Sequence, residues 1–350
     1  MRGKNKSTRR VVSPCHVGVD LLGSDIPPDE LFQAILFYCK ELNPSVNLTL
    51  FGTSALFGKT LPPVANLFFH VVKDVITMED APMTAIRQKR DSSLCIGIRR
   101  LKEGHLQAFI SAGNTGALMG YTKLQLSTLP HVQRPALLTL LPTRQKEIAV
   151  LDVGANTSYK AKHLIQFAAM GVAYQRSRGV KVPIVGLLNI GSEAKKGTPE
   201  LQQVYRQLLI DSKKSSSYAF AGNIEGRDVF RGEIDVLVTD GFTGNVFLKT
   251  AEGIAAVILE QLESSPLEEC SPHMKGILAE LRQRLHYAEY PGALLCGVDG
   301  IVIKCHGNSS PQSFIHSITT ATRLVQHSFL DQVRKELKPH STRGIPNPEK

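Results

Sequence analysis

A unit made of a short apolar strand and a polar, glycine-containing loop recurs along this chain and constrains its fold more than any other feature. The clearest copy lies at 234–249, where residues 234 to 239 read as a strand and a loop with Gly241 and Gly244 leads into a helix. Similar units begin near residues 16, 107, 148, 184 and 300. Short, β-branched, apolar strands are typical of a parallel sheet that is buried on both faces. The pattern therefore predicts an α/β protein with a mostly parallel sheet.

The six loops also predict one binding site. In open α/β sheets the ligand binds beside the carboxyl ends of the strands, so we expect the loops to converge there. Backbone N–H groups of glycine loops and helix N-termini attract anions. Asn245 is expected to open the helix that follows the loop after residue 240. A phosphate or an oxyanion is therefore the ligand that this edge of the sheet should hold.

The charge of the chain argues against nucleic acid as that ligand. The formal net charge is +10, and five of these charges lie in the first ten residues, which leaves +5 for the rest. A modest basic excess favours an acidic small molecule or an acidic protein as the partner. We expect residues 1–11 to form a basic flexible tail.

Cysteine usage and hydropathy bear on the compartment. The six cysteines are scattered without a C-x-x-C pair, so neither a zinc site nor a disulfide framework is expected. The N-terminal segment lacks the apolar core of a signal peptide, and no stretch reaches the ~18 uncharged apolar residues of a membrane span. We expect a cytoplasmic protein, with peripheral contact at the inner face of the membrane left open.

Helical periodicity predicts helices at about 29–42, 94–103, 160–174, 199–209, 246–262, 275–286 and 313–337. We expect a helical hairpin over about 246–288, with Leu267 and Met274 at its tip. It could contact a membrane or a partner, but we favour packing in a dimer. The three prolines of 124–142 predict irregular or edge structure. Residues 338–350 read as a polar tail.

Two polar segments allow more than one interpretation. Residues 52–60 resemble a nucleotide-binding P-loop, but five residues instead of four separate the glycines and two prolines follow, so we reject a P-loop. A second polar segment forms either a solvated helix end or a phosphate contact. It consists of Lys89, Arg90, Ser92 and Ser93.

Several single residues are similarly open. Asp20, Asp152 and Asp240 end three strands and could share a divalent metal ion, although we favour loop caps because no further ligand spacing is visible. His306 could serve as a base, but a structural role is the more common one for such a residue. Arg134 could be functional or merely exposed, and we favour the exposed side chain.

Six motifs in fixed order resemble those of the bacterial phosphate acyltransferases. They are SAGNTGAL, LDVGAN, GLLNIG with a following KG, GNIEGRD, DGFTGNV with a following LK and EG, and GVDGIVIKCHG. The resemblance runs from about Val17 to Leu324. It implies a three-layer α/β/α enzyme with a fold like that of isocitrate and isopropylmalate dehydrogenases, in a single domain over 12–337.

The resemblance also implies an activity and its partners. Members of the family, usually homodimers, transfer a fatty acyl group from acyl carrier protein to inorganic phosphate. For this chain we expect neither a cofactor nor a metal ion. The acyl phosphate then feeds a membrane-bound glycerol-3-phosphate acyltransferase in phospholipid synthesis. The family usually reads DAMGGD where this chain has 20–25 and YGGAPLLG where it has 290–297. The changes at Pro291 and Leu294 leave acyl-chain preference open.

Two catalytic residues are expected within these motifs. Phosphate already carries a nucleophilic oxygen at neutral pH, so attack on a thioester needs positioning more than a strong base. Lys196 is expected to place a positive charge on the phosphate or the oxyanion, and Asn245 to donate to the oxyanion. A solvated turn for Lys196 and a helix cap for Asn245 are the alternatives. Further substrate contacts are expected from Ser111, Gly113, Asn114, Thr115, Gly116, Asn156, Asn223, Asp240, Gly241 and Gly244.

Two other functions compete with acyl transfer. A dehydrogenase of the same fold would bind a nicotinamide cofactor and hold Mg²⁺ on the strand-end aspartates, but no G-x-G-x-x-G follows a strand. A binding module without catalysis would sense phosphate or acyl carrier protein through the same loops. Since acyl carrier proteins are acidic, basic residues should dock them, and the candidates are Arg99, Arg100, Lys102, Arg282 and Arg284.

Overall fold

The structure of the protein is a computed structural model, which describes residues 15–39, 46–58, 64–214, 216–264, 271, 274–279, 281, 292–307 and 309–338. Its strands are β1 (Cys15–Asp20), β2 (Val46–Gly52), β3 (Leu67–Val71), β4 (Ala108–Ser111), β5 (Ala136–Pro142), β6 (Glu147–Leu151), β7 (Ile184–Leu188), β8 (Ala219–Ile224), β9 (Val236–Val238), β10 (Ala293–Cys296) and β11 (Ile301–Lys304). They form one eleven-stranded sheet in the order β3-β2-β1-β4-β11-β10-β5-β6-β9-β7-β8.

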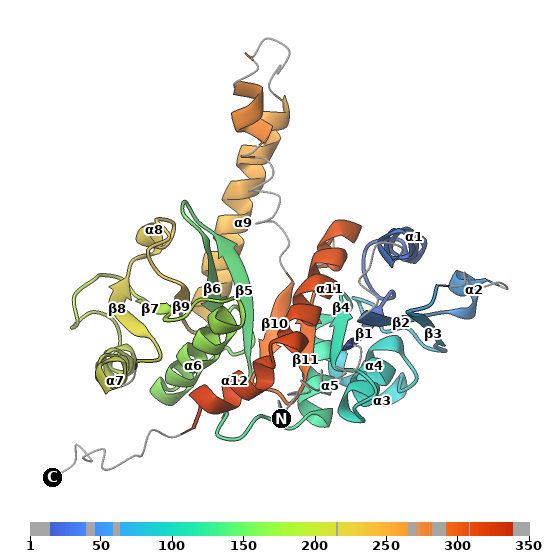
Figure 1. Ribbon diagram of the computed structural model, residues 1–350, viewed down its shortest axis with the longest axis horizontal. Coiled ribbons are helices and arrows are strands. Elements are labelled where there is room, and N and C mark those ends of the chain that lie inside the picture. The colour runs from blue at the N-terminus through green and yellow to red at the C-terminus, as the bar shows by residue number, and fades with distance from the viewer. Residues whose placement is uncertain are drawn as a thin grey trace, which may run out of the picture.

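The helices follow the strands as the sequence pattern indicates. They are α1 (Pro28–Cys39), α2 (Ser54–Phe57), α3 (Pro82–Gln88), α4 (Ser93–Lys102), α5 (Thr115–Gln125), α6 (Ala161–Ser177), α7 (Pro199–Lys214), α8 (Gly226–Val229), α9 (Gly241–Ser264), α11 (Pro311–Gln326) and α12 (Phe329–Glu336). Side chains of Ser92, Asn114 and Ser310 accept backbone N–H bonds at three helix N-termini, which fixes where α4, α5 and α11 begin. Figure 1 shows α9 rising out of the body, away from the sheet.

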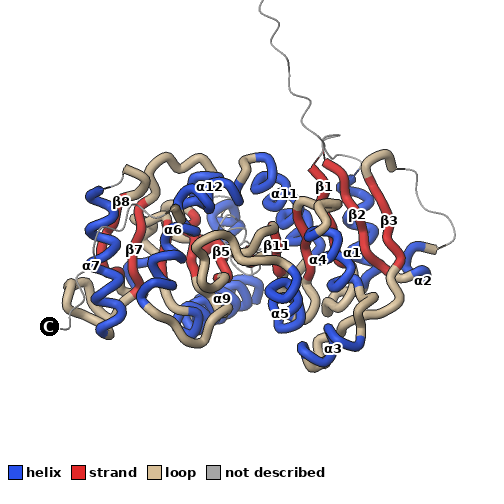
Figure 2. Tube along the Cα trace, turned by 90° about the horizontal axis from the view of Figure 1, so that it is seen from below, coloured by secondary structure: helices blue, strands red, loops and turns tan. Residues whose placement is uncertain are grey.

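Helices cover both faces of the sheet and produce three layers (Figure 2). One core lies between the sheet and α1, α6, α11 and α12, and a second lies between the sheet and α3, α4, α5 and the start of α9. Successive residues of β9 alternate between these cores, since Val236 and Val238 belong to the first and Leu237 to the second. The predicted three-layer α/β/α class is therefore confirmed.

The sheet consists of two parallel halves that run in opposite directions. Strands β3, β2, β1, β4 and β11 are parallel, and so are β6, β9, β7 and β8. Between them, β10 is antiparallel to both β11 and β5, and β5 is antiparallel to β6. These three reversals give the halves opposite senses. The six predicted loops therefore follow strands of opposite sense and belong to two groups, so strand direction alone does not bring them to one edge of the sheet. That both groups converge on one ligand stays a prediction.

The segment 124–142 also differs from its prediction. It contains β5, which is buried in the middle of the sheet and not at an edge. Pro135 precedes this strand and Pro142 ends it, so neither proline removes a hydrogen bond from the strand interior.

Two helix predictions are corrected. The helix expected over 313–337 is divided into α11 and α12, because Ser328 adopts a left-handed conformation with φ of 50° between them. Helix α9 begins at Gly241, so Asn245 lies inside it and does not open it. Of the expected hairpin, α9 is described together with residues 271, 274–279 and 281, and the tip residue Leu267 lies outside the described residues. The tails 1–11 and 339–350 lie outside them as well.

Helix α9 is the one described helix that is long and apolar enough to cross a membrane, judged by length and composition alone. Its residues 241–262 have a mean hydropathy of 1.3, and only 17% of an 18-residue stretch of the helix is buried. Phe242, Val246 and Ile254 are among its exposed apolar side chains. The sequence criterion passed over this helix because Lys249 and Glu252 interrupt the apolar run.

Candidate functional site

The first group of loops lies at the ends of β1, β4 and β11 and is built around a buried carboxylate. Ser111 donates its hydroxyl to Asp20 at 2.8 Å, and the backbone N–H of Leu22 also donates to Asp20. Gly113 N–H in turn donates to the Ser111 hydroxyl oxygen at 3.0 Å. Burial raises the pKa of Asp20 from 3.8 to about 6, although hydrogen bonds from Ser93 and others oppose the rise. The donors of Ser111 are thus directed at a protein carboxylate.

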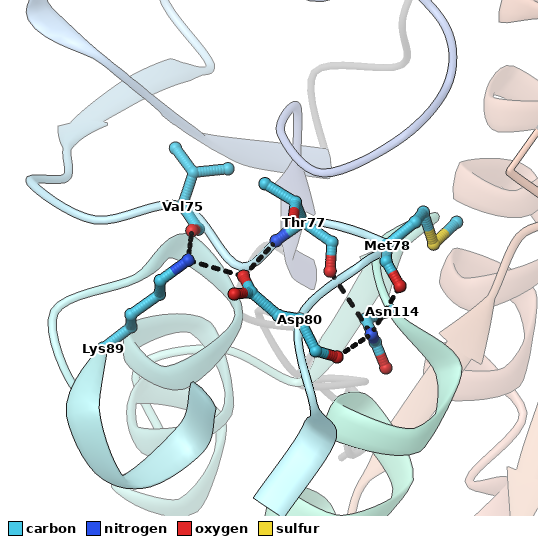
Figure 3. A network of polar contacts seen from close by, with 6 residues as sticks. All are labelled: Val75, Thr77, Met78, Asp80, Lys89 and Asn114. Atoms are coloured by element: carbon cyan, nitrogen blue, oxygen red, sulfur yellow. Dashed lines mark hydrogen bonds and ion pairs between the residues drawn. The ribbon is translucent and has the colours of Figure 1, made fainter. Parts of the chain in front are cut away.

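Asn114 in the same loop is occupied by main-chain contacts. Its side-chain nitrogen lies 3.0–3.2 Å from the carbonyl oxygens of Thr77, Met78 and Asp80, as Figure 3 shows. Its side-chain oxygen accepts the backbone N–H of Ala117 and caps α5. Asn114 therefore ties the loop before α3 to the start of α5. Of the residues predicted here, Thr115 and Gly116 are exposed.

The polar residues around Lys89 make hydrogen bonds to other parts of the protein. Lys89 donates to Asp80 at 2.5 Å and to the carbonyl oxygen of Val75 at 2.9 Å (Figure 3). Ser92 caps α4 by accepting the N–H of Cys95. These contacts are structural, but Ser92 and Ser93 are buried, so the segment is not the solvated helix end that one of the two interpretations expected. A phosphate contact stays a prediction.

The second group of loops lies at the ends of β6, β9, β7 and β8, and Asp152 is its buried centre. The two oxygens of Asp152 accept backbone N–H groups of Leu137, Gly154, Ala155 and Asn156, and the Asn156 side chain also donates to them. Gly241 and Gly244 pack directly on this loop, because a Cβ on Gly244 would lie 2.0 Å from the carbonyl oxygen of Asp152. The close approach explains why glycine is needed there.

Asn245 is an exposed residue of this second group. One N–H of its side chain donates to the carbonyl oxygen of Val153 at 3.1 Å. Among the described residues, no partner is recorded for its second N–H or its side-chain oxygen. Asp240 provides the cap of α9 instead, because it accepts the N–H groups of Phe242 and Thr243. Asn245 therefore retains a donor that the fold does not use.

Lys196 lies in the loop after β7, which two asparagines hold. Asn189 donates to the carbonyl oxygen of Lys196 at 3.2 Å and to the side chain of Asn223 at 3.1 Å. Asn223 donates to the carbonyl oxygen of Glu193 at 2.8 Å. The Lys196 ammonium is about half exposed and lies 3.6 Å from the Glu193 carboxylate, a loose surface pair. Asn223 thus positions the loop, whereas the Lys196 charge is available to a ligand.

The first group also contains a buried lysine that the sequence analysis did not identify. Lys304 ends β11 and is 9% exposed, and its ammonium donates to the carbonyl oxygens of Ala112 and Cys305. Burial lowers its pKa. Lys249 of α9 acts electrostatically on both Lys304 and His306, so the start of α9 lies within charge range of the end of β11. The available signal was a lysine at the end of the otherwise apolar run IVIK.

The three strand-end aspartates each make separate contacts within the protein. Among the described residues, no group of three His, Cys, Asp or Glu side chains is placed to hold a metal ion. Asp20 binds Ser111, Asp152 binds the 153–156 loop, and Asp240 caps α9. The favoured interpretation as loop caps is confirmed for Asp152 and Asp240.

Burial lowers the pKa of the His306 side chain, so at neutral pH this histidine is less readily charged than an ordinary one.

The fold belongs to a class shared with known acyl-transferring enzymes. It is similar to a phosphotransacetylase from Streptococcus pyogenes, with a TM-score of 0.61, 14% identity, and coverage of 89% of this chain and 94% of that one. A branched-chain phosphotransacylase from Enterococcus faecalis gives a TM-score of 0.59 at 14% identity, over 89% of this chain and 99% of that one. A 4-hydroxythreonine-4-phosphate dehydrogenase, described as putative, from Salmonella typhimurium gives 0.51 at 13% identity, over 89% and 99%. At such identities the similarity concerns the fold alone.

Sequence comparison is more specific. Residues 15–332 match the family model described as fatty acid synthesis protein. The chain is 38% identical to the phosphate acyltransferase of Chlamydia pneumoniae, over 92% of this chain and 98% of that protein. It is 37% identical to the one of Macrococcus caseolyticus and 36% to the one of Pseudomonas fluorescens, with 92% of this chain covered and 98% and 97% of those proteins. The chain therefore belongs to this family, that of the phosphate acyltransferases, and is an acyltransferase.

Proposed function

We propose that this protein transfers a fatty acyl group from acyl carrier protein to inorganic phosphate and releases acyl phosphate and the free carrier thiol for phospholipid synthesis. The observation that carries the proposal is the similarity to phosphate acyltransferases over 92% of the chain. The geometry of the second loop group supports it, because Lys196 and Asn245 both present polar hydrogens that the fold does not consume.

Phosphate is the nucleophile in this scheme. An oxygen of the bound phosphate attacks the thioester carbonyl, a C–O bond forms, and the C–S bond breaks as the carrier thiol leaves with a proton. Lys196 neutralises the charge on phosphate, and the second N–H of Asn245 donates to the carbonyl oxygen as it becomes an oxyanion. No general base is required.

Some of the other predicted site residues are proposed to contact phosphate, and the rest hold the loops of the site in position. Thr115 and Gly116 are exposed and remain proposed phosphate contacts of the first loop group. Asn223 holds the Lys196 loop, and Asn156 holds Asp152 and the carbonyl oxygen of Pro135. The start of α9 is held in position by Asp240, Gly241 and Gly244. The loop after β4 is held in position by Ser111, Gly113 and Asn114.

Three accompanying features belong to the same proposal. The protein acts as a homodimer in the cytoplasm, where its product reaches a membrane-bound glycerol-3-phosphate acyltransferase. The exposed apolar side chains of α9, such as Val246 and Ile254, support contact of this helix with a second copy or with the membrane surface. The single domain extends over 12–337.

The test is to incubate the protein with long-chain acyl carrier protein and phosphate and to trap acyl phosphate with hydroxylamine. Hydroxamate that depends on phosphate is the expected result. Lys196→Ala should raise the KM for phosphate by roughly tenfold, since one exposed charge contact is lost. If the carrier binds and its thioester stays intact, the protein is a binding module instead. If neither happens, titration with NAD and Mg²⁺ would test the dehydrogenase alternative.

A further inference from the structure

Three cations form a basic rim beside the second loop group. Arg134 precedes β5, while Lys160 and Lys162 stand at the start of α6. Both lysines are exposed and Arg134 is half-buried. All three act electrostatically on the buried His163 and, after burial itself, lower its pKa. The three charges therefore lie within electrostatic range of the same residue, His163.

The basic rim is connected to both loops that carry the proposed catalytic residues. Arg134 donates to the carbonyl and hydroxyl oxygens of Ser158 at 2.9 and 3.3 Å, and Asn156 donates to the carbonyl oxygen of the neighbouring Pro135. The backbone of 153–154 then contacts Asn245. On the other side, the hydroxyl of Tyr159 lies 3.4 Å from that of Thr198, two residues beyond Lys196. The rim therefore lies between the Asn245 and Lys196 loops.

Some cations in the described part of the chain have a carboxylate partner, and these three do not. Ion pairs engage Lys89, Arg99, Lys146, Arg176, Arg178, Lys196, Arg227, Arg231, Lys249 and Arg334. Within the described ranges, no carboxylate lies within ion-pair distance of Arg134, Lys160 or Lys162. Three like charges without a counter-charge repel one another, so an acidic surface placed against them gains favourable energy.

We propose that the basic rim of Arg134, Lys160 and Lys162 is the docking surface for the acidic carrier protein. This inference rests on the proposed function, which makes an acyl carrier protein the donor. The thioester stands at the end of a flexible pantetheine arm, so the carrier itself must dock at the border of the site and not within it. Opposite charges at such a border mainly raise the association rate and make it sensitive to salt.

The basic residues that the sequence suggested for docking the carrier protein are less suitable than this rim. Arg99, Arg100 and Lys102 occupy the last turn of α4, which packs on β1, β2 and β4 of the first half-sheet, whereas Lys196 and Asn245 follow strands of the second half-sheet. Arg99 is moreover paired with Asp91 at 3.6 Å. Arg282 and Arg284 lie outside the described residues.

The experiment compares two charge-reversed variants of the full-length protein. Lys160→Glu/Lys162→Glu alters the rim, and acidic residues in a first helical turn are favourable, so folding should be retained. Lys181→Glu/Lys213→Glu is the matched control, because both lysines are exposed and precede β7 and β8 at the amino ends of those strands. Each variant is assayed with long-chain acyl carrier protein and with the same acyl group on free pantetheine.

The rim variant should raise the KM for acyl carrier protein by roughly tenfold, with kcat unchanged and a weaker dependence on salt. Its KM for acyl pantetheine should equal that of the unaltered protein, and the control should behave like the unaltered protein with both donors. The proposed docking surface would be wrong if both variants changed the KM for acyl carrier protein equally. It would also be wrong if the rim variant lost activity equally with both acyl donors. If the unaltered protein consumes neither thioester, the proposed function fails. Direct titration of both variants with the carrier protein then decides the docking surface separately.

Discussion

The two loop groups have the same sequence pattern but use their polar atoms differently. After β4, Ser111 is fully buried and bonded to Asp20, and Asn114 is 6% exposed and bonded to three carbonyl oxygens. After β7 and β9, the side chains of Lys196 and Asn245 are exposed and only partly engaged. The comparison teaches that a glycine loop after a strand indicates where a ligand can bind, while the neighbouring contacts decide whether its donors remain available.

The largest expected effect comes from the close packing of the second group. Gly244→Ala should lower the free energy of unfolding by about 4 kcal/mol, because the new Cβ would lie 2.0 Å from the carbonyl oxygen of Asp152. Gly253→Ala in the same helix is the matched control, since nothing lies within 4 Å of its Cβ position. The control should stabilise the protein by up to ~1 kcal/mol. Denaturant unfolding measures both, and similar values for the two variants would contradict the packing.

Two asparagines provide the next test. Asn245→Ala should lower turnover on the order of 100-fold with little loss of stability, because the proposed oxyanion donor is removed from an exposed side chain. Asn114→Ala should instead lower the free energy of unfolding by roughly 2 kcal/mol, because a helix cap and buried carbonyl partners are lost. Turnover per folded molecule should remain within a few-fold for Asn114→Ala. The reverse pattern would exchange the roles assigned to the two groups.

The smallest effect concerns the buried carboxylate of the first group. Since burial raises the pKa of Asp20 to about 6, the folded protein holds this proton more tightly than the unfolded chain does. The resulting stabilisation is complete below about pH 4 and is lost as the pH rises through 6. Relative to Asp20→Asn, the natural protein should therefore lose roughly 2 kcal/mol between these pH values. A difference in unfolding free energy that stays constant with pH would show that Asp20 titrates normally.

Much of the fold was predictable because its signals are local. Apolar β-branched runs such as 148–151 and 236–238 became buried strands, and the helices after 160 and 199 lie close to their expected ranges. The opposite senses of the half-sheets were not predictable, because strand direction depends on which distant segments pair. Two hairpins, β5–β6 and β10–β11, and the long-range antiparallel pairing of β10 with β5 together reverse the direction, and no local signal distinguishes these strands from parallel ones.

The site was predictable in position more than in detail. The strand–loop–helix pattern identified the loops containing Lys196 and Asn245, which the structure leaves accessible. It could not show that Asn114 is consumed by the loop of 77–80, because that contact joins segments 34–37 residues apart. Lys304 escaped notice for the same reason, since its partner Ala112 lies 192 residues away.

The attachment of α9 has a mechanical consequence. The helix is 24 residues long, so it extends about 36 Å, and its start is fixed by Gly241 and Gly244 against the Asp152 loop. In Figure 1 its far end stands clear of the sheet. A tilt of about 5° at the base therefore displaces the far end by about 3 Å, as in a lever. A force on the far end of α9 would therefore move the first turns of the helix, which carry Asn245.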